Sequence, residues 1–149
     1  MKQFIIFIAF VAISSTSLFA QDNKANNIDN SNIALEGYSP VSYADLSLAQ
    51  KGVKEFKATH EGITYYLTSA EQKVTFEKNP EKYLPQYGGY CAYGVAKDSL
   101  VKIEPENWMI VEDKLYLNYN DDFQQLWEED IAGFIATADA KFESLLKNQ

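Results

Sequence analysis

The chain has 149 residues, of which 46% are hydrophobic, and it carries 21 acidic against 13 basic side chains, a formal net charge of −8. This acidic balance argues against nucleic acid or an anionic membrane surface as a partner, because both would repel the protein. The length and the aromatic content of 14% suit one domain with a hydrophobic core.

Residues 1–20 have the layout of a secretory signal peptide. Lys2 supplies the positive start, residues 4–13 form a short apolar run, and Leu18-Phe19-Ala20 resembles a cleavage site. We expect cleavage after Ala20 and an exported protein, periplasmic or secreted, with no membrane attachment afterwards. Residues 21–32 are polar and asparagine-rich, which predicts a flexible leader. The domain is then residues 33–149.

The first half of the domain begins with residues 34–43, where Gly37 and Pro40 favour an extended segment ending in a short edge strand. Residues 54–60 and 63–68 alternate like strands around Glu61-Gly62, which predicts a hairpin that pairs His60 with Ile63 and Ala58 with Tyr65. Ser69 followed by Gln72 predicts a capping box and a helix that ends at Asn79. Residues 80–83 should then form a one-turn helix, started by Pro80 and capped by Asn79.

The second half begins with a predicted hairpin over residues 108–119, with Glu112-Asp113 at its turn and Trp108, Ile110, Leu115 and Leu117 on one face. Asn120 or Asp121 can cap a helix that carries Phe123, Leu126, Trp127 and Ile131. Gly133 should break the pattern before a final helix with Ile135, Ala138, Phe142 and Leu145 on one face. This order predicts an α+β fold, an antiparallel β-sheet built from hairpins packed against helices, with a C-terminal helical pair.

The most distinctive stretch is residues 79–95, NPEKYLPQYGGYCAYGV, which holds the single cysteine and four tyrosines. Gly88 and Gly89 permit a sharp turn that places Cys91 among aromatic rings. A lone cysteine in an exported protein is buried and inert, paired between chains, or reactive, and burial is the favoured interpretation.

Several motifs resemble the YHS domain family in the same order. They are GYSPVSY from Gly37, YYLTSAEQKVTFEKNPEKYL from Tyr65, QYGGYCAYGV from Gln86 and LYLNYN from Leu115. The resemblance covers nearly all of the domain and looks like the exported, single-domain branch of the family. It implies metal-ligand positions at Ser42, Tyr66, Thr68 and Gln72, where the family's cysteines and histidine are missing. Hydroxyl and amide groups replace thiolates poorly around a soft metal, so the resemblance supports the fold more than the metal site.

Three kinds of site follow from these residues. A copper or zinc site would have to recruit His60 and Cys91, with Met109 and carboxylates, because the usual ligand counts cannot be met within one chain. A thiol-dependent enzyme or redox protein would use Cys91 with His60. A small-molecule pocket would be lined by Tyr87, Tyr90 and Tyr93 beside Gly88 and Gly89, whereas Tyr65, Tyr83 and Tyr116 are assigned to the core.

The sequence therefore favours an exported, non-enzymatic binding module of the YHS type for a small molecule or metal ion, contacted near Cys91, Tyr90 and Tyr93. The first alternative is the thiol-dependent enzyme. The second alternative is a structural or interaction domain in which Cys91 belongs to the core. No particular protein partner is indicated.

Overall fold

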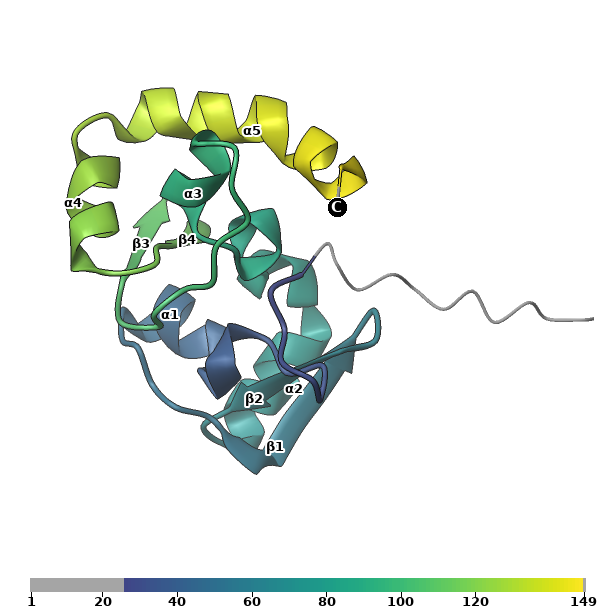
Figure 1. Ribbon diagram of the computed structural model, residues 1–149. Helices are drawn as coiled ribbons and strands as arrows, with labels where there is room; N and C mark the ends of the chain where they lie inside the picture. Colours follow the sequence, from purple (N-terminus) through teal and green to yellow (C-terminus); the bar gives the residue numbers. More distant parts are fainter. Residues whose placement is uncertain (1–25, 149) are drawn as a thin grey trace, which may run out of the picture.

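The computed structural model describes residues 26–148 and confirms a mixed α+β fold (Figure 1). The expected signal peptide lies outside the described residues. The helices are α1 (Pro40–Leu46), α2 (Ala70–Lys78), α3 (Ala92–Ala96), α4 (Asp121–Glu128) and α5 (Ile131–Lys147); the strands are β1 (Val53–His60), β2 (Ile63–Leu67), β3 (Trp108–Val111) and β4 (Lys114–Leu117). No helix within this part of the chain is both long and apolar enough to cross a bilayer.

The strands form two separate two-stranded antiparallel sheets, β1–β2 and β3–β4, where the sequence suggested one sheet. The outer edges of β2 and β4 form isolated β-bridges with irregular segments, such as those of Pro85 with Leu115 and of Cys91 with Leu117. Irregular segments therefore lie where a continuous sheet would need strands. In Figure 1 the β1–β2 hairpin with α2 forms one end of the molecule, and α3, α4 and α5 form the other.

Both hairpins have the predicted register. His60 pairs with Ile63 in the first hairpin, and Ile110 pairs with Leu115 in the second. Glu112 and Asp113 have φ angles of 49° and 61°, so the second turn adopts a primed geometry without the glycine that usually supplies it. Residues of the predicted apolar faces, including Leu115 and Leu117, are buried in the core.

The extended segment predicted over residues 34–43 is wrong, because its second half is helix α1. Ser39 is the N-cap, and its Oγ accepts a hydrogen bond from the Ser42 amide at 3.3 Å. Pro40 occupies the first turn, where its missing N–H costs nothing and its fixed φ suits a helix. The Ser-Pro pair thus begins a helix. Val41 and Tyr43, which the prediction placed on a strand, lie on α1, and both side chains are buried in the core.

Helix α2 begins and ends as predicted, but its capping box is modified. The Ser69 Oγ accepts from the Gln72 amide at 3.2 Å, as such a box requires. The Gln72 side chain accepts instead from the Thr68 amide, one residue before the cap, at 3.1 Å. The one-turn helix Pro80–Tyr83 is also present, although the Asn79 side chain makes no capping hydrogen bond to it.

The C-terminal helical pair is confirmed, but Gly133 lies inside α5 and does not break it. The break falls at Asp130, whose Oδ1 accepts from the Gly133 amide at 3.0 Å as the N-cap of α5. A Cβ on residue 133 would collide with that carboxylate, so the glycine makes room for the cap. On α4, Trp127 is buried as expected, whereas Leu126 is 36% exposed.

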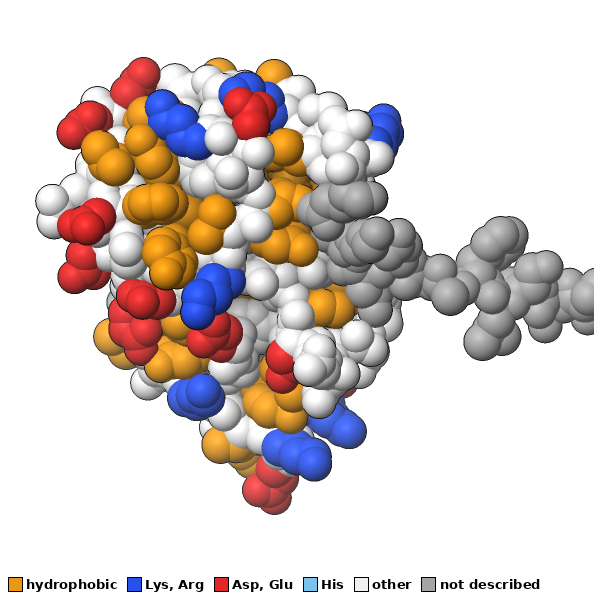
Figure 2. Space-filling model, in the orientation of Figure 1, with side chains coloured by type: hydrophobic (Ala, Val, Ile, Leu, Met, Phe, Trp, Pro, Cys, Tyr) orange, Lys and Arg blue, Asp and Glu red, His pale blue; other side chains and the backbone are white. Residues whose placement is uncertain are grey.

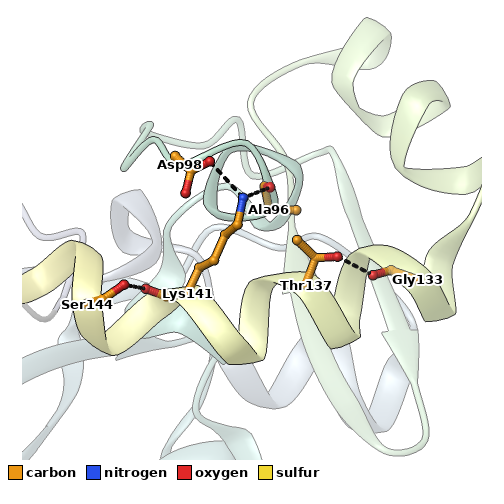
Figure 3. Close-up of polar contacts among 6 residues, drawn as sticks. All are labelled: Ala96, Asp98, Gly133, Thr137, Lys141 and Ser144. Atoms are coloured by element: carbon orange, nitrogen blue, oxygen red, sulfur yellow. Dashed lines mark hydrogen bonds and ion pairs between the residues drawn. The ribbon is translucent and has the colours of Figure 1, made fainter.

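Helix α5 lies across α3 and holds it through Lys141 (Figures 1 and 3). The Lys141 Nζ donates to the Ala96 carbonyl at 3.1 Å and pairs with Asp98 Oδ2 at 2.7 Å. It thereby satisfies a carbonyl at the C-terminal end of α3, where positive charge is favoured. Ala138 and Phe142 of α5 pack into the same buried cluster as Val95 of α3.

Candidate functional site

Cys91 is fully buried and serves as the N-cap of α3, which confirms the favoured interpretation. Its Sγ accepts from the Gly94 amide at 3.3 Å and donates to Asn118 Oδ1 at 3.5 Å. Burial raises the pKa of the thiol, although the hydrogen bond from the Gly94 amide and the nearby backbone amides of Tyr119 and Tyr93 act in the opposite direction. The thiol therefore stays protonated at neutral pH and is a poor nucleophile.

This environment predicts how the thiol reacts. In the native protein, Cys91 should resist a disulfide reagent and label stoichiometrically only after unfolding. Replacement of Cys91 by serine keeps a capping acceptor, whereas replacement by alanine removes it. In urea unfolding, Cys91→Ala should therefore have a free energy of unfolding about 1 kcal/mol lower than that of Cys91→Ser. Rapid native labelling, or serine and alanine variants of equal stability, would contradict the capping role.

The predicted turn at the Gly-Gly pair is present. Tyr87, Gly88 and Gly89 all have positive φ, at 53°, 60° and 79°. The described part of the expected leader lies against this turn, because the amide of Asn27 donates to the Gly88 carbonyl at 2.9 Å. The Asn27 side chain donates to the Gly89 carbonyl at 3.1 Å. The two glycine carbonyls are thus hydrogen-bonded within the chain.

Tyr87 belongs to a closed aromatic cluster rather than to a pocket. Its ring lies 5.9 Å from that of Tyr116 and 5.5 Å from that of Phe142. Its hydroxyl donates to Asp139 at 2.8 Å, and burial raises its pKa. Only 7% of the residue is exposed, so Tyr87 has a packing role, as do Tyr65, Tyr83 and Tyr116.

Tyr90 lines an open hollow of about 660 Å³, which we name the Tyr90 hollow. The hollow lies between the Gly-Gly turn, the loop after α3 and the end of α5, and its lining residues are Tyr90, Asp98, Ser99, Leu100, Val101, Leu145 and Asn148. The Tyr90 hydroxyl donates to the Asn26 carbonyl at 3.4 Å. The volume of the Tyr90 hollow falls in the range of small-molecule sites.

Tyr93 lies in a different environment from Tyr90. Its ring packs edge-on against Phe123 at 5.3 Å and Phe134 at 5.1 Å. The three tyrosines assigned to one pocket therefore separate into a buried cluster, a hollow and an aromatic surface.

Among the described residues, the side chains of His60 and Cys91 share no hydrogen-bonding or ion-pairing partner. The His60 Nε2 lies 2.9 Å from Glu81 Oε1, at the tip of the first hairpin. Cys91 contacts Gly94 and Asn118 in the interior. The described contacts therefore give the thiol no histidine base and give a metal no His60–Cys91 pair. Within residues 26–148, no group of three or more His, Cys, Asp or Glu side chains is arranged to hold a metal ion.

Three of the four positions that the YHS resemblance assigns to metal ligands do come together. The Gln72 amide nitrogen donates to Ser42 Oγ at 3.0 Å, and the Gln72 oxygen accepts from the Thr68 amide at 3.1 Å. Ser39 donates to the same oxygen at 2.7 Å, and Ser42 donates to Gln50 at 2.9 Å. Tyr66 instead lines a separate hollow with Gly37 and Gly52.

These residues, which we name the Gln72 cluster (Ser39, Ser42, Gln50, Thr68 and Gln72), do not fit a copper or zinc ion. The side chains of Ser39, Ser42, Gln50 and Gln72 are neutral hydroxyls and amides that already bond to one another, and Thr68 contributes its backbone amide. Soft metals prefer thiolate and imidazole. The cluster joins α1, the end of β2 and the start of α2 by hydrogen bonds, beside the core residues Val41, Leu67 and Phe76 of the same elements. We therefore assign it a structural role.

Asn118 is a central residue that sequence reasoning missed. It is fully buried, and its Oδ1 accepts from the Tyr93 amide at 3.1 Å as well as from Cys91. Its Nδ2 donates to Gln124 at 2.8 Å, and its own amide donates to the Asn107 carbonyl at 2.7 Å. The only signal in the sequence was a polar residue directly after an apolar strand, in LYLNYN.

Comparisons with protein-family models, characterised proteins and solved structures gave no significant match for this chain. The YHS resemblance therefore stays a prediction.

Proposed function

We propose that this protein is an exported, non-enzymatic binding module whose small-molecule ligand occupies the Tyr90 hollow. The observation that carries the proposal is the hollow itself, which adjoins the Gly-Gly turn and is lined by one tyrosine of the predicted site. Export rests on the signal-peptide pattern of residues 1–20. The assembly of Ser42, Thr68 and Gln72 in one cluster supports a YHS-like fold.

The lining favours a neutral ligand with a polar and an apolar side. Leu100, Val101 and Leu145 offer apolar surface, while Ser99 and Asn148 offer hydrogen-bonding groups. Among the described lining residues the one carboxylate, that of Asp98, is paired with Lys141 at 2.7 Å. A charged ligand would have to compete with that ion pair, whereas a neutral ligand would not.

A thiol-dependent enzyme receives less support. Such an enzyme needs an accessible thiolate with a base beside it. Cys91 is buried with a raised pKa, and His60 is paired with Glu81. Metal binding receives less support as well, because the Gln72 cluster offers only neutral oxygen and amide groups.

The structural or interaction domain remains the second candidate, and one observation favours it. Cys91 and Tyr87, which the sequence placed in the site, are both packed into the interior. This candidate predicts that the Tyr90 hollow takes up no ligand.

A paired substitution separates these candidates. Ser99→Trp places a large side chain in the hollow, and Ser144→Trp makes the same change at an exposed position of α5 outside it. The isotopically labelled protein is titrated with neutral aryl glycosides, N-acetyl amino-acid amides and short alkyl amides. At least one class should shift the amide resonances of residues 99–101.

The Ser99→Trp variant should abolish that shift, and Ser144→Trp should leave it unchanged. Equal losses in both variants would show that binding is elsewhere. No shift with any of the three classes would favour the structural domain.

A further inference from the structure

A row of partly exposed aromatic rings joins α3, α4 and α5 on one face of the molecule. We name it the aromatic row; it consists of Tyr119, Phe123, Tyr93 and Phe134, with successive ring centroids 5.5, 5.3 and 5.1 Å apart. Leu126, one turn along α4 from Phe123, adds exposed apolar surface. Figure 2 shows hydrophobic side chains gathered between α4 and α3 on the visible face.

The ring faces of this row already attract a cation. The Lys97 Nζ lies 5.3 Å from the Tyr93 ring centroid and 5.0 Å from that of Phe134. Both distances suit a cation–π interaction. An arginine side chain, which is planar and less strongly hydrated, would stack on such rings more favourably than lysine.

The edge of the row is acidic. Four exposed carboxylates lie on or directly after α4: Asp121, Asp122, Glu128 and Glu129. Within residues 26–148, none of them takes part in an ion pair. Acidic side chains border the apolar surface along α4 in Figure 2. Aromatic surface beside carboxylates that form no ion pair within the described residues complements a partner that is both apolar and positively charged.

We propose that the aromatic row and the α4 carboxylates dock a cationic, amphipathic segment of a partner protein, with its basic side chains on the carboxylates and rings. A second copy of this chain fits poorly, because it would bring the same acidic rim against itself. An anionic lipid surface is disfavoured for the same reason. The row shares no residue with the lining of the Tyr90 hollow, so the two proposals stand or fall separately.

The test uses the protein purified from its own host, with whatever processing occurs there. Its ligand is a synthetic helical peptide about four turns long, with arginine on one face and leucine on the other. A control peptide replaces every arginine with glutamine. Binding is measured by fluorescence anisotropy at about 0.15 M salt, where distant surface charges are largely screened. The arginine peptide should bind and the glutamine peptide should not.

Matched variants separate this face from general attraction to an acidic protein. Neutralising the four α4 carboxylates (Asp121→Asn, Asp122→Asn, Glu128→Gln, Glu129→Gln) should weaken binding about tenfold. Neutralising four exposed carboxylates elsewhere (Glu55→Gln, Glu71→Gln, Glu77→Gln, Glu143→Gln) changes the net charge equally and should have little effect. Equal weakening by both sets would overturn the proposal.

A substitution of Lys97 is expected to strengthen peptide binding, whereas the carboxylate substitutions weaken it. Lys97→Gln removes the cation that competes for the rings and should tighten peptide binding about threefold. The control Lys54→Gln removes an exposed charge on β1 and should leave the affinity unchanged. Equal effects of the two lysine variants, binding of the glutamine peptide, or attachment to phosphatidylglycerol vesicles without peptide binding would each reject the cationic docking face.

Discussion

Replacing Asn118 with leucine should lower the free energy of unfolding by about 3 kcal/mol. Leucine has a similar size, so the change removes hydrogen-bonding groups without leaving a large cavity. The Tyr93 amide would lose its acceptor, the Cys91 Sγ its acceptor, and Gln124 its donor. A buried donor without a partner pays its full desolvation cost, which exceeds the net value of an ordinary hydrogen bond.

Urea unfolding followed by tryptophan fluorescence measures this effect, since Trp127 is buried and Trp108 is half-buried. Asn30→Leu is the matched control, because Asn30 is exposed and the same change there should stay within about 0.5 kcal/mol. The Asn118→Leu variant should also label faster at Cys91, since the N-terminal end of α3 loses the side-chain hydrogen bonds to residue 118 and keeps only the bridge between Cys91 and Leu117 of β4. Losses of similar size at both positions would remove Asn118 from its central role.

The second large effect is expected for Gly52→Ala, at about 2–3 kcal/mol of destabilisation. Gly52 is buried immediately before β1, and its amide donates to the Gly37 carbonyl at 2.8 Å. A Cβ there would collide with the backbone carbonyl of Tyr66, which cannot rotate away as a side chain would. The backbone at residue 52 must therefore move away from Tyr66 of β2.

Gly62→Ala is the control for this effect. Gly62 has a φ of 81° at the hairpin tip, and a Cβ there meets no atom within 4 Å. Its substitution costs only the backbone strain of a left-handed residue, about 1 kcal/mol. Thermal melts of both variants compare steric exclusion with strain. If Gly62→Ala is the more damaging change, the close approach of Gly52 to β2 is not what limits stability.

The proposed functions use parts of the protein that the sequence had placed in one site. Tyr90 borders the hollow, Tyr93 belongs to the aromatic row, and Cys91 lies between them in the interior. Two neighbouring tyrosines on opposite sides of a buried residue contribute to different surfaces because α3 begins there. The two proposed binding surfaces thus depend on one short segment.

The sequence by itself determined the local structure wherever neighbouring residues interact with one another. The hairpin registers followed from alternating apolar residues, and the start of α2 followed from the Ser69 cap. The start of α4 followed from a cap at Asn120 or Asp121, of which the structure uses Asn120. The burial of Cys91 followed from the preference of a lone thiol for the interior. The Ser-Pro start of α1 was also encoded locally, but the proline was interpreted as a strand edge.

The tertiary structure alone decided which distant residues meet. Ser42 and Gln72 are 30 positions apart and Cys91 and Asn118 are 27 apart, and no periodicity in the sequence links either pair. Only the packing of α3 against α4 and α5, and of the turn at residues 86–89 against β4, separated Tyr87, Tyr90 and Tyr93 into three environments. Contacts between distant segments depend on how whole elements pack, and the pattern within one segment contains no information about its neighbour. The division into two sheets has the same origin, because irregular segments around Pro85 and Cys91 occupy the edge of β4.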